Sequence, residues 1–314
     1  MSVLSKPYFH DEAAAFAFVE GIIWNGSPHC PTCGSVKIYA IKPNPEKKVR
    51  MGLKKCGDCK RQFTVRIGTI FEESHLPLHK WLQAIYLMCS SKKGISAKQL
   101  ERTLECTYKT AWFLAHRIRE AMRSGDLSPF GNDGGVVEAD ETFFGREPGK
   151  PVQRGVAHKM KVLTLIDRET GRARSCVIDD LKTETIGPIV LANVQREAAL
   201  MTDEAHRFQS IGRHFASHDT VNHAKDEYVR YGDPVITTNT VENYFSVFKR
   251  GMKGTYQHCA KKHLHRYLAE FDFRYSNRSA LGCEDQERTV RALVGIIGKR
   301  LTYRSANGRI EAHG

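Results

Sequence analysis

The sequence lacks any long apolar run: no stretch approaches the roughly 18 residues that a membrane-spanning helix needs. Its amino-terminal stretch has acids within the apolar part and no small-residue cleavage site, so it lacks the pattern of a secretory signal. Hydrophobic residues make up 41% and charged residues 26% of 314 residues, a composition typical of a globular protein with two or three modules. We therefore expect a cytoplasmic protein with no membrane partner.

Acidic residues are in short supply relative to basic ones. There are 35 Asp and Glu against 48 Lys and Arg, which gives a formal net charge of +13 and a pI near 9.3. Such a balance favours a polyanionic partner, and nucleic acid is the common one. A merely solvated basic surface would produce the same totals, so the choice depends on motifs.

Nine cysteines are present, but a cytoplasmic protein is not expected to use them as a disulfide framework. Four of them are paired as Cys30, Cys33, Cys56 and Cys59, in a C-x2-C, 22-residue, C-x2-C pattern. Two residues between thiolates let a tight turn direct both sulfurs at one tetrahedral ion. We predict a structural Zn2+ site in a zinc ribbon over residues 26–73. Four unrelated reduced thiols, or a redox C-x-x-C, are the alternatives.

The segments around the ribbon have helical periodicity. Residues 1–25 are expected to form a helical segment, and residues 74–127 a helical region with a short helix, a turn near residues 105–107 and a longer helix from Tyr108. Two helices joined this tightly fit a helix-turn-helix-like DNA-binding region. Its outward face would carry Tyr108, Lys109, Thr110 and His116. A plain helical hairpin would show the same pattern.

From residue 136 the periodicity becomes that of strands. Three strands with short turns, a helix over 183–198, a strand at "ALMTDE", a helix, a strand at "SHDTVNH" and a final helix follow in that order. This β-β-β-α-β-α-β-α order predicts an α/β, RNase H-like domain with a mixed sheet over residues 136–281. The fold requires acids at three places, where the sequence has Asp140, Asp203 and Glu242.

Carboxylates suit Mg2+ or Mn2+, and acids separated by 62 and 38 residues can meet only through the fold. Glu242 lies seven residues before Lys249, hence about 10 Å along one helix face. Lys249, Arg250 and Lys253 would then neutralise DNA phosphates. Each acid also has a structural reading, as a helix cap or as a polar group on an exposed strand face.

The motifs "CPTCGS", "CGDCKRQFTVRIGTIFEES", "EADETFFG", "MTDE", "VNHAKDEYV" and "TNTVENYFSVFKRGMKGTYQHCAKKHLHRYLAEFDFRYSNR" span most of residues 20–280. Together they resemble the DDE transposases of bacterial insertion sequences that carry an amino-terminal zinc ribbon. The resemblance implies a DNA-binding, nucleoid-associated enzyme for element ends and target DNA, assembled as a homo-oligomer on DNA. It also implies two-metal-ion strand cleavage and strand transfer.

The same resemblance assigns Asp140, Asp203 and Glu242 as ligands of Mg2+ or Mn2+, with Asn239 as an alternative third ligand. Glu138 would be a helper on the face of Asp140, and His218 and His223 would lie near the site. Two other functions fit the motifs: a zinc-ribbon regulator with an inert second domain, and a host nuclease of the same fold.

After residue 282 we expect a carboxyl-terminal helix and tail, with "VRALVGIIGKRL" (290–301) as the helix.

Overall fold

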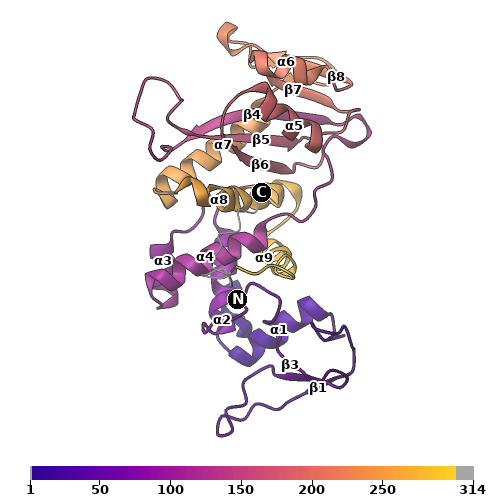
Figure 1. The fold of residues 1–314 in the computed structure, drawn as a ribbon, viewed down its shortest axis with the longest axis vertical. Coiled ribbons are helices and arrows are strands. Elements are labelled where there is room, and N and C mark those ends of the chain that lie inside the picture. Colours follow the sequence, from indigo (N-terminus) through magenta and orange to yellow (C-terminus); the bar gives the residue numbers. More distant parts are fainter. Residues whose placement is uncertain (1, 302–314) are drawn as a thin grey trace. The chain divides into compact units, whose positions relative to one another are not determined.

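The computed structural model describes residues 2–301, and within that range no helix is both long enough and apolar enough to cross a membrane. The described chain divides into two compact units (Figure 1). The first comprises residues 2–90, 97–122 and 285–301, and the second comprises residues 91–96 and 123–284. We describe each unit by itself.

The first unit joins a small antiparallel sheet to a group of helices. Its strands are β1 (Ile38–Ala40), β2 (Lys54–Cys56) and β3 (Gln62–Phe63), in the order β1-β2-β3. Its α-helices are α1 (Glu12–Trp24), α2 (Leu78–Ser90), α3 (Ala97–Leu104), α4 (Tyr108–Met122) and α9 (Asp285–Val294). Asp11 caps α1 by accepting a hydrogen bond from the backbone of Ala14 at 2.7 Å, which satisfies one of the free amides of the first turn.

Helices α3 and α4 are joined by a tight turn in which Glu105 has a left-handed backbone, φ 51°. The first turn of α4 exposes Tyr108, Lys109 and Thr110. The expectation that His116 shares this outward face is wrong: it is 1% exposed and packs on Trp112, with ring centroids 4.0 Å apart. Since four helical positions separate these two rings, His116 follows the apolar stripe of the helix.

The predicted helix over 290–301 is displaced in the structure. Helix α9 begins at Asp285 and ends at Val294, because Gly295 and Gly298 follow and Gly298 has φ +72°. Beyond the helix, Ile297 forms an isolated antiparallel bridge with Thr69. Residues 302–314 of the expected tail lie outside the described residues.

The second unit is built on a five-stranded mixed sheet. Its strands are β4 (Val136–Phe144), β5 (Met160–Asp167), β6 (Ala173–Ile178), β7 (Ala199–Asp203) and β8 (Ser217–Val221), in the order β6-β5-β4-β7-β8. The β4-β5-β6 part is the predicted antiparallel meander, whereas β7 and β8 run parallel to β4. A two-stranded sheet of β9 (Val229–Arg230) and β10 (Ile236–Thr237) follows. This topology confirms the RNase H-like fold.

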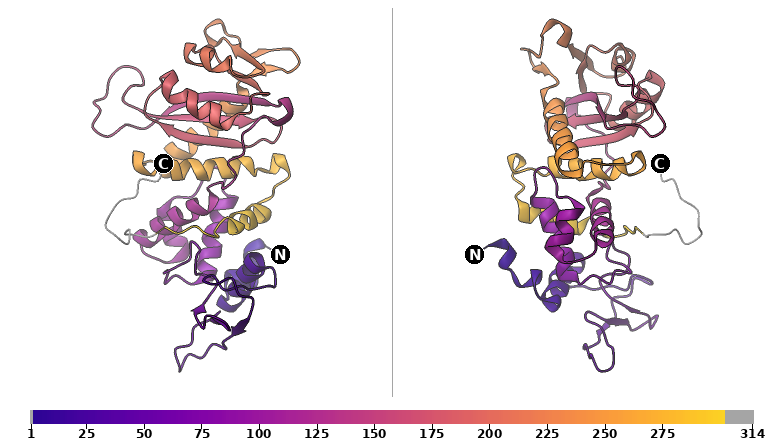
Figure 2. Two further views of the ribbon diagram at one scale, coloured as in Figure 1. Left: turned by 45° about the vertical axis from the view of Figure 1, so that its right-hand side comes forward. Right: turned by 90° about the vertical axis from the view of Figure 1, so that its left-hand side faces the viewer.

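Helices cover both faces of this sheet, as Figures 1 and 2 show. They are α5 (Thr183–Asn193), α6 (His206–Gly212), α7 (Asn239–Gly251) and α8 (Lys261–Ser276). Val137 and Ala139 of β4 belong to a core with residues of α5 and α6, whereas Phe144 belongs to a second core with residues of α7 and α8. Because strand side chains alternate, Glu138 and Asp140 lie on the α7 side of β4.

Candidate functional site: a four-cysteine cluster and an acidic cluster

The four paired cysteines of the first unit converge. Cys30 Sγ lies 3.6 Å from Cys59 Sγ, and Cys33 Sγ lies 3.6 Å from Cys56 Sγ. Four sulfurs at 2.3 Å from a tetrahedral Zn2+ would be about 3.8 Å apart, so these spacings fit the ion. All four atoms form one group within 4.8 Å, which supports a structural zinc site with every ligand supplied by the chain.

The backbone of the cysteine turns favours thiolate at one ligand. Burial acts to raise the pKa of the Cys56 thiol, but hydrogen bonds from the backbone N–H groups of Cys59 and Asp58, and from the side chains of Cys33 and Cys59, lower the pKa to about 6. Thiolate is the form of cysteine that binds metal. The turn therefore favours the thiolate form of Cys56 and also directs its sulfur toward the other three cysteines.

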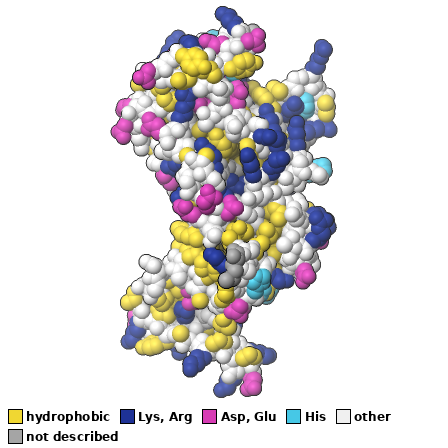
Figure 3. Space-filling view, turned by 180° about the vertical axis from the view of Figure 1, so that it is seen from behind, with side chains coloured by type: hydrophobic (Ala, Val, Ile, Leu, Met, Phe, Trp, Pro, Cys, Tyr) yellow, Lys and Arg dark blue, Asp and Glu magenta, His cyan; other side chains and the backbone are white. Residues whose placement is uncertain are grey.

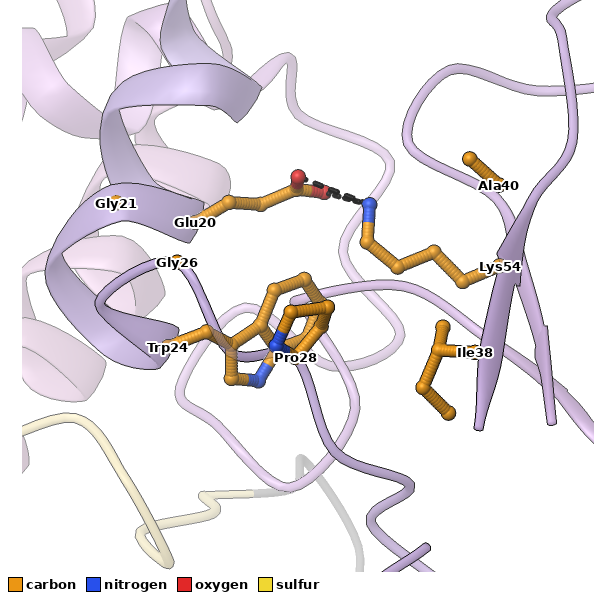
Figure 4. Close-up of a pocket in the computed structure, with 8 residues that line it drawn as sticks. All are labelled: Glu20, Gly21, Trp24, Gly26, Pro28, Ile38, Ala40 and Lys54. Carbon is orange, nitrogen blue, oxygen red and sulfur yellow. Dashed lines mark hydrogen bonds and ion pairs between the residues drawn. The ribbon is translucent and has the colours of Figure 1, made fainter. Parts of the chain in front are cut away.

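The ribbon packs on the end of α1 through aromatic contacts. The Trp24 ring meets Phe63 edge to face at 6.1 Å, and Lys54 Nζ lies 5.2 Å from the Trp24 ring centroid. Lys54 Nζ also donates to both carboxylate oxygens of Glu20 at 2.9 Å. A pocket between α1 and the ribbon strands is lined by Glu20, Trp24 and Lys54 together with Ile38 (Figure 4). Lys54, the cation in this pocket, is already paired with Glu20, so this ion pair stabilises the packing of β2 against α1.

In the second unit, strand register brings two predicted acids together. Glu138 of β4 lies opposite Met201 of β7 in parallel register, so Asp140 is level with Asp203, where β7 ends. Oxygen atoms of Asp140, Asp203 and Glu141 all lie within 4.8 Å of one another. Hard carboxylate oxygens converging at one sheet edge fit Mg2+ or Mn2+.

The electrostatics of this acidic cluster are those of crowded carboxylates. Burial, followed by the negative charges of Asp203 and Glu242, raises the pKa of Asp140 well above its usual range, and Arg207 and Lys249 oppose the shift. Burial likewise raises the pKa of Asp203. Asp140 and Asp203 are therefore costly to ionise without a nearby cation.

Glu242 acts on Asp140 from the first turn of α7, but it is outside the three-acid group among the described residues. Its Oε1 lies 3.2 Å from Nε2 of His223. Asn239, the alternative third ligand, is exposed. Glu242 is thus the residue whose charge reaches Asp140, and His223 is its neighbour. The other histidine, His218, hydrogen-bonds Thr202 at 2.9 Å, and burial lowers its pKa.

Two residues of the cluster were absent from the sequence predictions. Glu141 points to the α6 side of β4, has a 4% exposed side chain and forms an ion pair with Arg207. Its Oε2 is buried and has no hydrogen-bond partner within the described part of the chain. Alternation along β4 places Glu141 on the opposite face from Asp140, so the sequence pattern did not indicate Glu141 as a member of the cluster. In the structure both carboxylates nonetheless reach one point. No sequence signal identified Arg207.

Basic side chains extend the α7 face. Glu242 and Lys249 both interact electrostatically with Asp140, as their seven-residue spacing predicts. Burial lowers the pKa of Lys249, the charge of Asp140 opposes this, and the charges of Lys253 and Lys159 lower the pKa of Lys249 further, so each of these two lysines lies within electrostatic reach of Lys249. Arg250 is exposed and donates to the carbonyl of Ser246. Figure 3 shows Lys and Arg side chains gathering on part of the second unit.

Comparison with known proteins gives matches to both units. Residues 133–276 match the family described as ISXO2-like transposase domain, and residues 10–62 match the family described as transposase zinc-ribbon domain. An uncharacterised protein in the transposable element ISH50 of Halobacterium salinarum is 29% identical over 283 residues, which cover 85% of this chain and 91% of that protein.

A solved structure, the simian T-cell lymphotropic virus intasome in complex with PP2A regulatory subunit B56 gamma, is 13% identical to this chain with a TM-score of 0.29. It covers 55% of this chain and 67% of that one, and the likeness is too weak to carry an argument. The two family matches together contain both clusters described above. The chain thus combines an ISXO2-like transposase domain, over residues 133–276, with a transposase zinc-ribbon domain, over residues 10–62.

Proposed function

We propose that this chain is an active transposase that binds the ends of its element, cleaves a DNA strand at each end and joins the freed ends to target DNA. The observation that carries the proposal is the convergence of Asp140, Asp203 and Glu141 at the end of β7, with the charges of Glu242 and Lys249 acting on the same point. An inert domain would have no need to hold ionisable groups in so costly an arrangement.

The acids of the second unit would hold Mg2+ or Mn2+, which when bound supplies the Lewis-acid charge for in-line phosphoryl displacement. Asp140 and Asp203 would bind from rigid strands, and Glu242 would bind from α7. Glu141 is a further carboxylate within reach, held by Arg207. This division lets the sheet fix two ligands while the helix supplies the third.

The reaction would run in two displacements. Water attacks the phosphorus at the element end, the bond from phosphorus to the 3′ oxygen breaks, and a 3′ hydroxyl is freed. That hydroxyl then attacks a phosphorus of the target, and the target's own 3′ oxygen leaves. Joining two ends to one target predicts that copies of the chain act together on DNA.

Lysines of the α7 face would bind the phosphates beside the reacting one. Lys249, Arg250 and Lys253 were the expected contacts, and the electrostatic effect of Lys159 on Lys249 adds the residue that directly precedes β5. The exposed first turn of α4, with Tyr108, Lys109 and Thr110, supports a separate DNA contact in the first unit. Phosphate contacts of this kind position the duplex and make binding sensitive to salt.

The test is an incubation of the protein with labelled element ends, a target plasmid and Mg2+. We expect covalently joined end–target product that disappears in Asp140→Asn and Asp203→Asn. Nicked ends without joined product would favour a nuclease of the same fold. Binding to the ends without any cleavage, at all Mg2+ and Mn2+ concentrations, would favour the zinc-ribbon regulator and contradict the proposal.

A further inference from the structure

The buried ion pair of Glu138 with Arg168 lies beside the acidic cluster and takes no direct part in it. Glu138 is 0% exposed, and its Oε1 accepts a hydrogen bond from Arg168 Nε at 2.6 Å. Its Oε2 accepts a hydrogen bond from the backbone N–H of Val241 at 2.9 Å. Both oxygens are occupied, so the expected role of Glu138 as a helper on the face of Asp140 is replaced by a different contact.

That contact joins the two elements that carry Asp140 and Glu242. Glu138 precedes Asp140 by two residues, about 6.7 Å along the same face of β4. Val241 directly precedes Glu242 in the first turn of α7. Glu138 is flanked by Ile166 of β5 and Met201 of β7, so its backbone is fixed on both sides by the sheet.

The cap residue of α7 does not satisfy the backbone amide of Val241, which this carboxylate binds instead. Thr238 makes no side-chain cap hydrogen bond, and its hydroxyl lies 3.4 Å from His223 Nε2. A carboxylate at a helix amino terminus satisfies a free amide and complements the helix dipole. Glu138 supplies that acceptor from the neighbouring strand.

Arg168 also binds the backbone of the segment that directly precedes α7. Its Nη1 donates to the carbonyl of Val235 at 2.5 Å and its Nη2 donates to the carbonyl of Thr237 at 2.6 Å. Its own backbone N–H is bound to the carbonyl of Val136 in β4 at 3.0 Å. The planar guanidinium thus holds one carboxylate and two carbonyls in fixed directions.

We propose that Glu138 and Arg168 are positioning residues, which fix the separation between Asp140 and Glu242 and so determine how well Glu242 completes a divalent-ion site. The inference rests on the proposed function, since it assigns the ion site to these acids. Neither residue touches the reacting atoms. They act through the backbone of residues 235–241.

The test compares Glu138→Gln with a matched variant, Glu270→Gln, in the full-length protein. Glu270 is also 0% exposed in the second unit and also forms an ion pair with an arginine, Arg274, but it lies on α8. Gln at 138 cannot accept from both Arg168 and Val241 without directing N–H groups at a donor. Three measurements are made on each protein: Mn2+ binding by electron paramagnetic resonance, amide hydrogen exchange, and strand cleavage at increasing Mn2+ concentration.

For Glu138→Gln we expect Mn2+ affinity to fall about 10- to 100-fold, as for other groups that orient metal ligands. Exchange should accelerate at residues 239–243, and high Mn2+ should restore strand cleavage. Glu270→Gln should leave Mn2+ affinity and the first turn of α7 unchanged. Arg168→Gln should resemble Glu138→Gln.

Unchanged Mn2+ affinity in Glu138→Gln, with stability reduced as in Glu270→Gln, would overturn the inference and leave the pair a structural one. Wild-type protein that binds no Mn2+ would contradict the proposed function instead, and the inference would fall with it. Hydrogen exchange would still show, in that case, whether Glu138 orders the first turn of α7.

Discussion

The four-cysteine cluster and the acidic cluster both gather side chains that could hold a metal ion, but they are assembled in different ways. The cysteines come in two pairs, each spanning a single turn, and the antiparallel pairing of β1 with β2 brings the two turns together. The acids of the second cluster lie on β4 and β7, where sheet register makes Asp140 and Asp203 neighbours, and Glu242 acts on Asp140 from α7. Local spacing makes a site easy to recognise, whereas a site made by the fold can be perturbed from residues that never touch it.

Removal of a zinc ligand should show most clearly that the two clusters bind metal independently of each other. Cys56→Ser should take zinc content, measured by metal analysis, from about one ion per chain to none, because structural zinc contributes roughly 10–16 kcal/mol of apparent binding free energy. All three tryptophans, Trp24, Trp81 and Trp112, belong to the first unit, so their fluorescence reports on that unit. We expect the Trp24 contact with Phe63 to be lost while Mn2+ binding persists.

Cys106→Ser is the control for this change, because Cys106 is outside the four-cysteine group. Undiminished zinc in Cys56→Ser, or zinc lost equally in Cys106→Ser, would contradict the ribbon assignment.

Asp140→Asn should be the next largest effect. Loss of a ligand that supports several kcal/mol of charge stabilisation should reduce strand cleavage by roughly 10³-fold. Zinc content and binding to element ends should stay at wild-type levels, as judged by metal analysis and gel shift. Asp219→Asn, an acid on β8 outside the three-acid group, should retain cleavage. A parallel loss of DNA binding in Asp140→Asn would identify Asp140 as structural.

Asp272 should make the second unit sensitive to pH. It is partly buried on α8 and accepts hydrogen bonds from the backbone and hydroxyl of Ser175 and from Tyr244, yet burial raises its pKa to about 6. Since the folded pKa exceeds the unfolded value near 3.8, the folded state holds the proton more tightly. The stabilisation is present below about pH 4 and is lost as pH rises through 6, by at most about 3 kcal/mol.

Asp272→Asn should therefore flatten the dependence of unfolding free energy on pH between about 4 and 7. Urea unfolding followed by circular dichroism and hydrogen exchange would measure it, with tryptophan fluorescence as the internal control for the first unit. The same pH slope in wild type and variant would argue against the Asp272 carboxyl as its source.

Lys159→Ala should give the smallest effect. If Lys159 binds a phosphate beside Lys249, the slope of log affinity against log salt should decrease in magnitude by roughly 0.9. Fluorescence anisotropy with a labelled element end at several salt concentrations would detect the change. Lys182→Ala is the control, because Lys182 precedes α5 on the other face of the sheet. Equal slopes for Lys159→Ala and wild type would exclude the contact.

These two clusters also mark how far sequence reasoning reaches. The element order and the sheet followed from periodicity, because strand and helix patterns of the second unit are clean, and α5 forms despite Pro188. The convergence of Asp140 with Asp203 followed from the expected topology. The roles of Glu141 and Arg207 were not predicted, because alternation alone does not show that carboxylates from opposite faces of β4 can reach one point. The contact of Glu138 with Val241 was also hidden, since nothing local indicates which strand residue will cap a helix 103 positions away.

Helix α9 gives the first unit a property that its sequence position conceals. The helix packs on α2, where Arg288 Nη1 donates to the carbonyl of Cys89 at 2.8 Å, and the bridge between Ile297 and Thr69 follows it. The first unit is thus completed only by residues that follow the entire β4–β8 sheet in the chain. A gene copy interrupted just past codon 284 would keep the four cysteines and the acids of the second unit. Its product would lack helix α9, which packs on α2 in the unit that carries the zinc ribbon.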